Sequence, residues 1–258
     1  MNNKFNYFRT AFWALAATLV MCPIATASTI DATGVDSTRG EYGVWITADG
    51  ADMNTYFAGV ISIQLNNGST SVDRDTLCVD LFTDIYLGQT YATNVLVPSD
   101  MPGKNLEWVS WLVDNALLPT QNNTYASALP QSDWVTDPSQ GAGIQLAIWD
   151  IVEDGGDGFS SGRVQQGSVA NPTNPQVLYW AQTYETLSAS HTSDDAFVYL
   201  NVNMGNGQPA QMLEGPEFYT DGGPQPTPEC STLLIVGSAL VAIGSIRRRG
   251  VAGQSFLH

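Results

Sequence analysis

One cysteine and one glutamine are the residues of this chain whose types and positions point most directly to covalent chemistry. The chain has three cysteines, of which Cys22 and Cys230 lie in the terminal segments and Cys78 lies alone between them. A single cysteine cannot form a disulfide within its own domain. Cys78 is therefore predicted to be a free thiol, an intermolecular link or a partner in some other covalent bond.

Gln145 lies on the apolar side of a predicted helix. At about 100° per residue, Ile148, Trp149 and Val152 flank the direction of its side chain. A buried amide that lacks hydrogen-bond partners costs about 1–3 kcal/mol. We therefore expect either that the Gln145 amide bonds to the backbone of a neighbouring strand or that it is consumed in a covalent bond, and the sequence leaves both routes open.

The covalent route would join the two residues, because a cysteine thiolate can attack a glutamine carboxamide, release ammonia and leave an internal thioester. Leu77-Cys78-Val79-Asp80 and Ile144-Gln145-Leu146-Ala147-Ile148-Trp149 are the segments around them. Together they resemble the strand and helix motifs of the Cys-Gln thioester (TQxA-type) domains of bacterial surface adhesins. The helix motif of that family is often written Thr-Gln-x-Ala-Ile-Trp, and Ile144 stands here in place of Thr.

The resemblance implies covalent adhesion to a target surface. Gln145 would supply a thioester carbonyl that is protected from water until a nucleophile, typically a lysine amine, attacks it and forms an intermolecular amide. Cys78 would leave as the thiolate. Lys104 is the only lysine after residue 4, so an internal amine that could consume the thioester is nearly absent.

The hydrophobic pattern predicts one α+β domain over residues 28–221. Strands are predicted at residues 42–66, 75–82, 89–97 and 197–202, and helices at residues 106–117, 138–154 and 175–188. Asp137 is the expected N-cap of the second helix, with Gln140 in the capping-box position. The predicted fold is a β-sheet or barrel in the N-terminal part, a three-helix insertion and a returning C-terminal strand.

Residues 1–27 have the pattern of a secretory signal peptide. Lys4 and Arg9 precede an apolar run, and Ala25-Thr26-Ala27 supplies the small residues that a signal peptidase accepts. We expect cleavage after this tripeptide. A lipid attached at Cys22 is the alternative, but a bulky methionine precedes that cysteine, where lipid-attachment sites have a small residue.

The other end of the chain resembles a bacterial sorting tail. A linker and motif at residues 222–231 precede an apolar run at residues 232–246, and a basic segment at residues 247–258 follows. The motif residues and the basic cluster are Pro228, Glu229, Cys230, Ser231, Arg247, Arg248 and Arg249. This order is similar to the PEP-CTERM tail of exosortase substrates in Gram-negative bacteria, with Cys230 in place of the family's second proline.

The tail resemblance implies export and a processing partner. Residues 232–246 would insert as a transmembrane sorting helix with the arginines on the cytoplasmic side, and an exosortase-like enzyme would process the tail. The expected location is the outer cell surface or the extracellular matrix, with an inner-membrane anchor before processing. Because such tails are often associated with exopolysaccharide, the alternative function is that of a non-covalent exopolysaccharide or biofilm matrix protein, structural or binding.

Charge makes nucleic acid an unfavourable partner. The chain has 25 acidic residues, and the segment between the two terminal signals has only four basic ones to set against them. These are Arg39, Arg74, Lys104 and Arg163. Such an acidic surface repels phosphate backbones and keeps a secreted domain soluble.

No enzyme activity and no cofactor are expected. His191 is the only histidine available to a Ser-His-Asp triad before the tail, and no Gly-x-Ser-x-Gly elbow accompanies it. Four tryptophans would suit a sugar-binding face, but their helical, apolar spacing fits core packing better. They are Trp108, Trp111, Trp149 and Trp180.

One acidic turn is a candidate calcium site. Glu153, Asp154 and Asp157 lie in a glycine-rich stretch and offer the oxygen ligands that Ca²⁺ prefers. The EF-hand spacing is absent. A solvated acidic loop is therefore the simpler interpretation of the sequence alone.

Overall fold

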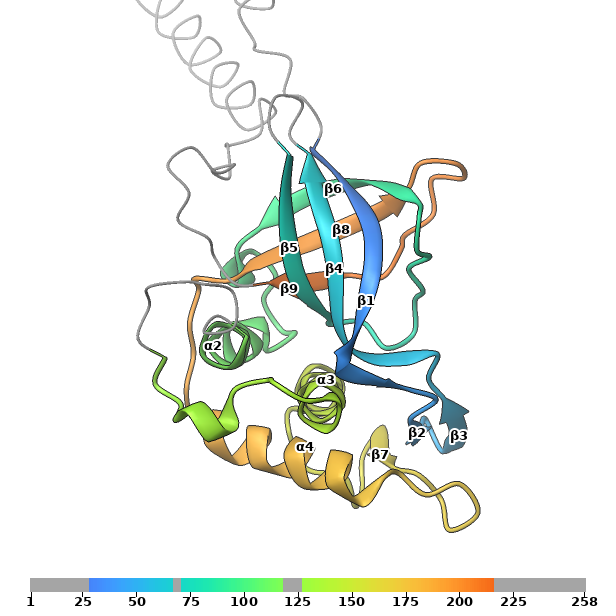
Figure 1. The fold of residues 1–258 in the computed structure, drawn as a ribbon, viewed down its shortest axis with the longest axis vertical. Coiled ribbons are helices and arrows are strands. Elements are labelled where there is room, and N and C mark those ends of the chain that lie inside the picture. Colours follow the sequence, from blue (N-terminus) through green and yellow to red (C-terminus); the bar gives the residue numbers. More distant parts are fainter. Residues whose placement is uncertain (1–27, 67–70, 118–126, 216–258) are drawn as a thin grey trace, which may run out of the picture. The chain divides into compact units, whose positions relative to one another are not determined.

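The computed structural model describes residues 28–66, 71–117 and 127–215, which belong to one compact unit. Six antiparallel strands close into a barrel in the order β1-β4-β5-β9-β8-β6 (Figure 1). These strands are β1 (Ser28–Tyr42), β4 (Phe57–Asn66), β5 (Ser71–Cys78), β6 (Thr90–Leu96), β8 (Phe197–Asn203) and β9 (Leu213–Gly215).

A small second sheet extends from one end of the barrel. Its order is β3-β2-β7, and the hairpin of β2 (Trp45–Ala48) and β3 (Ala51–Asn54) is inserted between β1 and β4. The third strand, β7 (Val164–Gln166), comes from the loop after the central helix. Two 3₁₀ turns, η1 (Pro98–Asp100) and η3 (Gln131–Asp133), precede helices.

Two helices pack on the barrel, a third packs on them, and the middle one in sequence is the most buried. They are α2 (Leu106–Ala116), α3 (Pro138–Asp154) and α4 (Pro175–Ser188). Helix α3 packs on β1 and β4 on one side and on α4 on the other (Figure 1). Every residue from 140 to 152 is buried, so α3 is surrounded by protein over three turns.

Two glycines allow α3 to approach its neighbours closely. A Cβ atom at Gly141 would lie 1.9 Å from the carbonyl oxygen of Arg39 in β1. A Cβ atom at Gly143 would lie 2.4 Å from the Cβ atom of Trp180 in α4. Any larger side chain at either position would push the helix away from the barrel or from α4.

Two apolar clusters meet at α3. One joins residues of the barrel strands, the small sheet, α3 and α4, and includes Ile30, Ile63, Tyr91, Leu146 and Trp149. The other lies between the barrel wall, α2 and α3 and includes Leu77, Leu112, Val113, Ile144 and Ile148. The α3 positions before and after Gln145 therefore belong to different clusters, and Gln145 lies at the boundary between them.

The predicted fold class is confirmed. The chain is α+β, its strands form a barrel, three helices follow, and a strand returns at residues 197–203. Each predicted helix matches an observed helix to within one residue. The predicted strand at residues 75–82 ends earlier, at Cys78, and the strands β1, β7 and β9 were not predicted.

Several predicted segments lie outside the described residues. They are the signal peptide at residues 1–27, the linker and motif at 222–231, the membrane helix at 232–246 and the basic tail at 247–258. Among the helices of the part that the structure describes, none has the length and apolar character needed to cross a bilayer.

Candidate functional site

The central helix α3 is fixed in position by its N-terminal cap. The Asp137 side chain accepts a hydrogen bond from the backbone N–H of Gln140 at 2.9 Å, and the Gln140 side chain in turn accepts one from the backbone N–H of Asp137 at 3.2 Å. This is the capping box that the sequence predicts, with Pro138 in the first turn. It sets the register of the helix and so the direction in which Gln145 points.

The structure brings Gln145 and Cys78 together. The Gln145 side-chain oxygen accepts a hydrogen bond from the backbone N–H of Cys78 at 2.9 Å, and its Nε2 donates to the carbonyl oxygen of Cys78 at 2.6 Å. Gln145 is fully buried and Cys78 is 3% exposed. The side-chain amide of one residue therefore lies directly on the backbone of the other, inside the protein.

The sheet leaves a gap at Cys78 that Gln145 fills. The β4–β5 ladder ends at the pair Ile61–Thr76, whereas β5 continues beside β9 through the pair Cys78–Leu213. Because both backbone groups of Cys78 bond to Gln145, they point away from β9, to the side where β4 has separated. The Gln145 amide therefore bonds to Cys78 as a residue of a neighbouring strand would. This is the non-covalent alternative that the sequence predicts, in which the buried amide forms hydrogen bonds with a strand backbone.

The surroundings of Cys78 keep its thiol protonated. Burial raises the pKa of the Cys78 thiol, and the nearby Asp80 carboxylate raises it further. Asp80 itself accepts hydrogen bonds from the Phe82 N–H at 3.0 Å and from the Thr83 hydroxyl at 2.5 Å. A thiol in this state is a poor nucleophile while the site is closed.

The arrangement also contains what an acyl transfer needs. The Gln145 amide contacts the backbone of the residue that carries the thiol, and the Cys78 backbone N–H lies on the amide oxygen. The Cys78 N–H is aimed at the oxygen on which negative charge would develop if a nucleophile added to the Gln145 carbon. The contacts shown are those of a structural amide, and they place Gln145 beside the residue with which a thioester would form.

The tryptophans and the histidine considered in the sequence analysis pack against other side chains. Trp149 is 3% exposed, and Trp108, Trp111 and Trp180 are partly buried against the apolar cluster beside α2. His191 stacks on Trp111 with ring centroids 4.3 Å apart. The four tryptophans thus belong mainly to the core, as their spacing predicts. The sorting-motif residues Pro228–Ser231 and Arg247–Arg249 lie outside the described residues.

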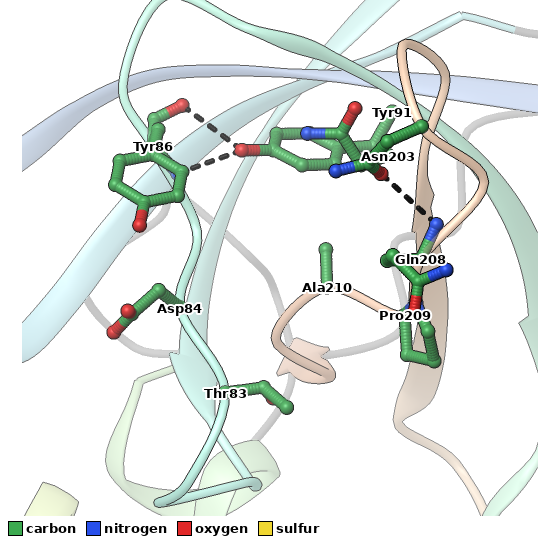
Figure 2. A pocket seen from close by; sticks show the side chains of 9 residues that line it. Thr83, Asp84, Tyr86, Tyr91, Asn203, Gln208, Pro209 and Ala210 are labelled. Atoms are coloured by element: carbon green, nitrogen blue, oxygen red, sulfur yellow. Dashed lines mark hydrogen bonds between the residues drawn. The ribbon is translucent and has the colours of Figure 1, made fainter.

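A polar pocket beside the barrel was missed by the sequence analysis. Its volume is about 200 Å³, and it lies between the loop that follows Cys78 and the β8–β9 connection (Figure 2). It is lined by Thr83, Asp84, Tyr86, Tyr91, Asn203, Asn206, Gln208, Pro209 and Ala210. The buried Tyr91 hydroxyl accepts a hydrogen bond from the Tyr86 N–H at 2.7 Å. No linear motif marks this pocket, because its walls come from two distant segments.

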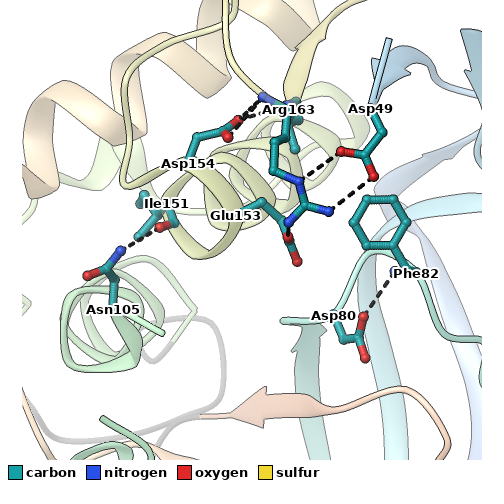
Figure 3. A network of polar contacts seen from close by, with 9 residues as sticks. Asp49, Asp80, Phe82, Asn105, Ile151, Glu153, Asp154 and Arg163 are labelled. Carbon is teal, nitrogen blue, oxygen red and sulfur yellow. Dashed lines mark hydrogen bonds and ion pairs between the residues drawn. The ribbon is translucent and has the colours of Figure 1, made fainter. Parts of the chain in front are cut away.

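An acidic network lies at the carboxyl end of α3 (Figure 3). The Arg163 guanidinium bonds to Asp49 at 2.8 Å and to the Glu153 carboxylate, and the Arg163 backbone N–H donates to Asp154. Glu153, one of the three residues considered for calcium, is thus paired with an arginine. The acidic cluster that the structure forms contains Asp150 instead of Glu153: oxygens of Asp150, Asp154 and Asp157 all lie within 4.8 Å of one another.

Two acidic side chains with raised pKa values, Asp150 and Glu185, adjoin this network. Burial raises the pKa of Asp150, and the carboxylates of Asp154 and Asp157 raise it further. Burial also raises the pKa of Glu185 to about 9, with the neighbouring Asp150 as the next cause. The two carboxyl groups therefore face each other between α3 and α4, at the inner side of the cluster.

Comparison with known proteins adds no relative to this description. No protein-family model, no curated protein and no solved structure matches the chain. The function is therefore argued from the residues and their geometry.

Proposed function

We propose that this protein is an exported, non-enzymatic surface or matrix protein that attaches covalently to its target through a thioester between Cys78 and Gln145. The observation that carries the proposal is the pair of hydrogen bonds between the Gln145 amide and the backbone of Cys78. They bring the lone cysteine of the domain to the one glutamine that the helical pattern directs into the core.

Thioester formation requires no external reagent. The Cys78 sulfur adds to the Gln145 side-chain carbon, the bond from that carbon to Nε2 breaks, and the thiol proton leaves with the amide nitrogen as ammonia. The product loses the Nε2 donor to the Cys78 carbonyl oxygen but keeps the acceptor oxygen on the Cys78 N–H. That N–H then polarises the thioester carbonyl, which favours attack by a nucleophile.

Burial supports the proposal in a second way. Water reaches neither side chain freely, since Gln145 is fully buried and Cys78 is 3% exposed. A thioester here would be shielded from hydrolysis, and the thiolate would leave only when the site opens and a proton is supplied. A target amine, typically that of a lysine, would complete the reaction by forming an amide with the Gln145 carbonyl.

The proposed destination rests on the two terminal segments. The signal at residues 1–27 supports export, and the PEP-CTERM-like tail supports handling by an exosortase-like enzyme and passage through an inner-membrane-anchored state. The final site would be the outer cell surface or the extracellular matrix. The acidic composition fits a soluble extracellular domain and opposes binding to nucleic acid.

The intact mass of the freshly purified chain tests the proposal. Loss of ammonia lowers the mass by about 17 daltons relative to the plain sequence, and incubation with methylamine replaces the deficit by an amine adduct at residue 145. A mass equal to that of the plain sequence, unchanged by amine, contradicts the thioester. In that case Gln145 is only a hydrogen-bonding group.

Matched variants identify the residues involved. Cys78→Ala and Gln145→Glu should both abolish the deficit and the adduct, because each removes one reactant. Cys230→Ser removes the other cysteine that remains after signal cleavage, and it should leave the deficit unchanged. A deficit that survives in Cys78→Ala would assign the reaction to another residue.

A second candidate function is non-covalent polysaccharide binding, and the pocket in Figure 2 is the observation that favours it. Tyr86 is 57% exposed there, beside amide side chains and the Asp84 carboxylate. An exposed aromatic ring next to polar groups is the usual means of holding a sugar ring. Tyr86→Ala should abolish the binding of the chain to a responsive exopolysaccharide, whereas Tyr56→Ala, which also alters an exposed tyrosine, should not.

A further inference from the structure

Arg163 joins three segments of the chain at the carboxyl end of α3 (Figure 3). Its guanidinium donates to the Asp49 carboxylate, in the turn between β2 and β3, at 2.8 and 3.1 Å, and to the Glu153 carboxylate near the end of α3. Its Cζ atom also lies over the Phe82 ring, 5.1 Å from the ring centre. A guanidinium over an aromatic face is attracted by the ring. One side chain therefore connects the small sheet, α3 and the chain that follows Cys78.

Gln145 and Glu153 lie on the same side of α3. Positions 145, 149 and 153 are spaced by four residues, and side chains at this spacing lie above one another on a helix. From the first of them to the last, the helix advances about 12 Å. Gln145 bonds to Cys78 at one end of this face, and Glu153 bonds to Arg163 at the other. Trp149, which is 3% exposed, lies between them.

The chain after Cys78 follows this face of α3. Cys78 contacts Gln145, and Phe82 lies under the guanidinium that pairs with α3 farther along. Four residues of chain reach about 13 Å, which suffices to connect the two contacts. Leu81, which is 6% exposed, belongs to the same apolar cluster as Cys78 and the tryptophan of α3. The segment 79–82 therefore covers the part of α3 that lies next to the proposed thioester.

The contacts at the far end of the segment 79–82 are the exposed ones. The Val79 N–H donates to the Met212 carbonyl oxygen at 3.0 Å, so the start of the segment is fixed to the barrel. At the other end, Phe82 is 48% exposed and the Arg163 side chain is 47% exposed. Contacts near solvent break at a lower cost than buried ones. Opening of the segment would therefore start at Phe82.

We propose that Arg163 is a latch that holds the segment 79–82 closed against α3 and so limits the access of a target amine to Gln145. The role of the latch in adhesion rests on the proposed thioester. The closure itself acts on Cys78 whether or not the covalent bond forms. This difference allows the latch and the thioester to be tested separately.

The rate at which iodoacetamide alkylates Cys78 measures the opening. The parent chain for this test carries Cys230→Ser, which leaves Cys78 as the only thiol after signal cleavage, and it is first treated with methylamine to open any thioester. Arg163→Gln should raise the alkylation rate about fivefold. About 1 M salt, which screens exposed ion pairs, should raise the rate of the parent chain but not that of the variant. Equal rates for the two chains would overturn the proposal.

Two further variants separate the latch from general effects of charge and stability. Lys104→Gln removes a positive charge from an exposed position outside the network and should change the rate less than twofold. Phe82→Leu keeps an apolar side chain but removes the ring under the guanidinium, and it should raise the rate about twofold. Local opening gives a rate that is insensitive to low urea. If the faster rate of Arg163→Gln instead rises with urea as global unfolding does, the latch is refuted.

Failure of the latch and failure of the thioester give different results. A mass deficit of about 17 daltons, together with equal rates of alkylation and of methylamine incorporation in the parent chain and Arg163→Gln, would leave the thioester and remove the latch. No mass deficit, together with a fivefold difference in alkylation rate, would remove the thioester and leave a latch over a free thiol.

Discussion

The proposed thioester predicts an unusually large loss of stability for a small change, Cys78→Ala. The two residues are 67 positions apart, and a covalent link across that loop constrains the unfolded chain. By the loop-closure relation for cross-links, this constraint is worth about 4 kcal/mol. If the wild type forms no thioester, Cys78→Ala removes only one buried sulfur atom, and the backbone of residue 78 still bonds to Gln145. The expected loss is then about 1 kcal/mol.

The companion change Gln145→Ala is predicted to be costly with or without the thioester. It leaves the N–H and C=O groups of Cys78 buried without partners, at about 1–3 kcal/mol for each group. Without a thioester the sum is about 2–6 kcal/mol. With a thioester, Gln145→Ala also removes the cross-link, worth about 4 kcal/mol, which Cys78→Ala removes as well. Because both variants lack the cross-link and only Cys78→Ala keeps the amide, the difference between them measures the structural role of the amide, and the loss in Cys78→Ala measures the cross-link.

Urea unfolding of wild type and both variants at neutral pH measures these differences. The cross-linked wild type should also have a smaller dependence of unfolding free energy on urea than Cys78→Ala, because its unfolded state exposes less surface. A loss below about 2 kcal/mol for Cys78→Ala with an unchanged urea dependence refutes the cross-link. A loss below about 1 kcal/mol for Gln145→Ala refutes the hydrogen-bond argument itself.

Three further changes test the fold around the site. Asp137→Ala removes the N-cap acceptor of α3 and should lower the unfolding free energy by about 1 kcal/mol in urea denaturation. Gly141→Ala places a methyl group against the Arg39 carbonyl oxygen and should cost about 3 kcal/mol, whereas Gly34→Ala, whose Cβ meets nothing within 4 Å, should cost less than about 0.5 kcal/mol. Equal melting temperatures for the two alanine variants would contradict the close approach of α3 to β1. Burial, followed by Asp114 and Asp194, holds the pKa of Glu214 well above its ordinary value, so the folded state keeps a proton that the unfolded state loses above about pH 4.3. Wild-type stability should therefore fall as pH rises from there, and Glu214→Gln should reduce this slope; an unchanged slope in a pH series of melting curves would rule the assignment out.

The helices were predictable because their signals are local. The cap at Asp137, the proline after it and the apolar spacing all act within a few residues, and helix α3 begins and ends where they indicate. The burial of Gln145 followed from the same periodicity, since the wheel directs its amide between apolar neighbours. The sequence could also suggest Cys78 as its partner, because it is the only cysteine left for the domain.

The closure of the barrel was harder to predict from the sequence, because the residues that determine it are far apart in the chain or lack a clear pattern. Strand β1 is long, rich in polar residues and interrupted by register shifts against β4, so no clean alternation marks it. Strands β7 and β9 have three residues each and form only because a neighbour supplies their pairing. The sequence analysis did not include Asp150 in the acidic cluster for a similar reason: its closeness to Asp157 depends on the path of the loop after α3.

Access to the proposed thioester depends on one rigid element. Gln145 belongs to α3, a helix buried from Gln140 to Val152 and fixed at its first turn by the Asp137 cap. A target amine can reach Gln145 only if the packing of α3 on the barrel opens. Asp137→Ala weakens the cap and should therefore speed methylamine incorporation at residue 145, and an unchanged rate would mean that the opening does not begin at the first turn of α3.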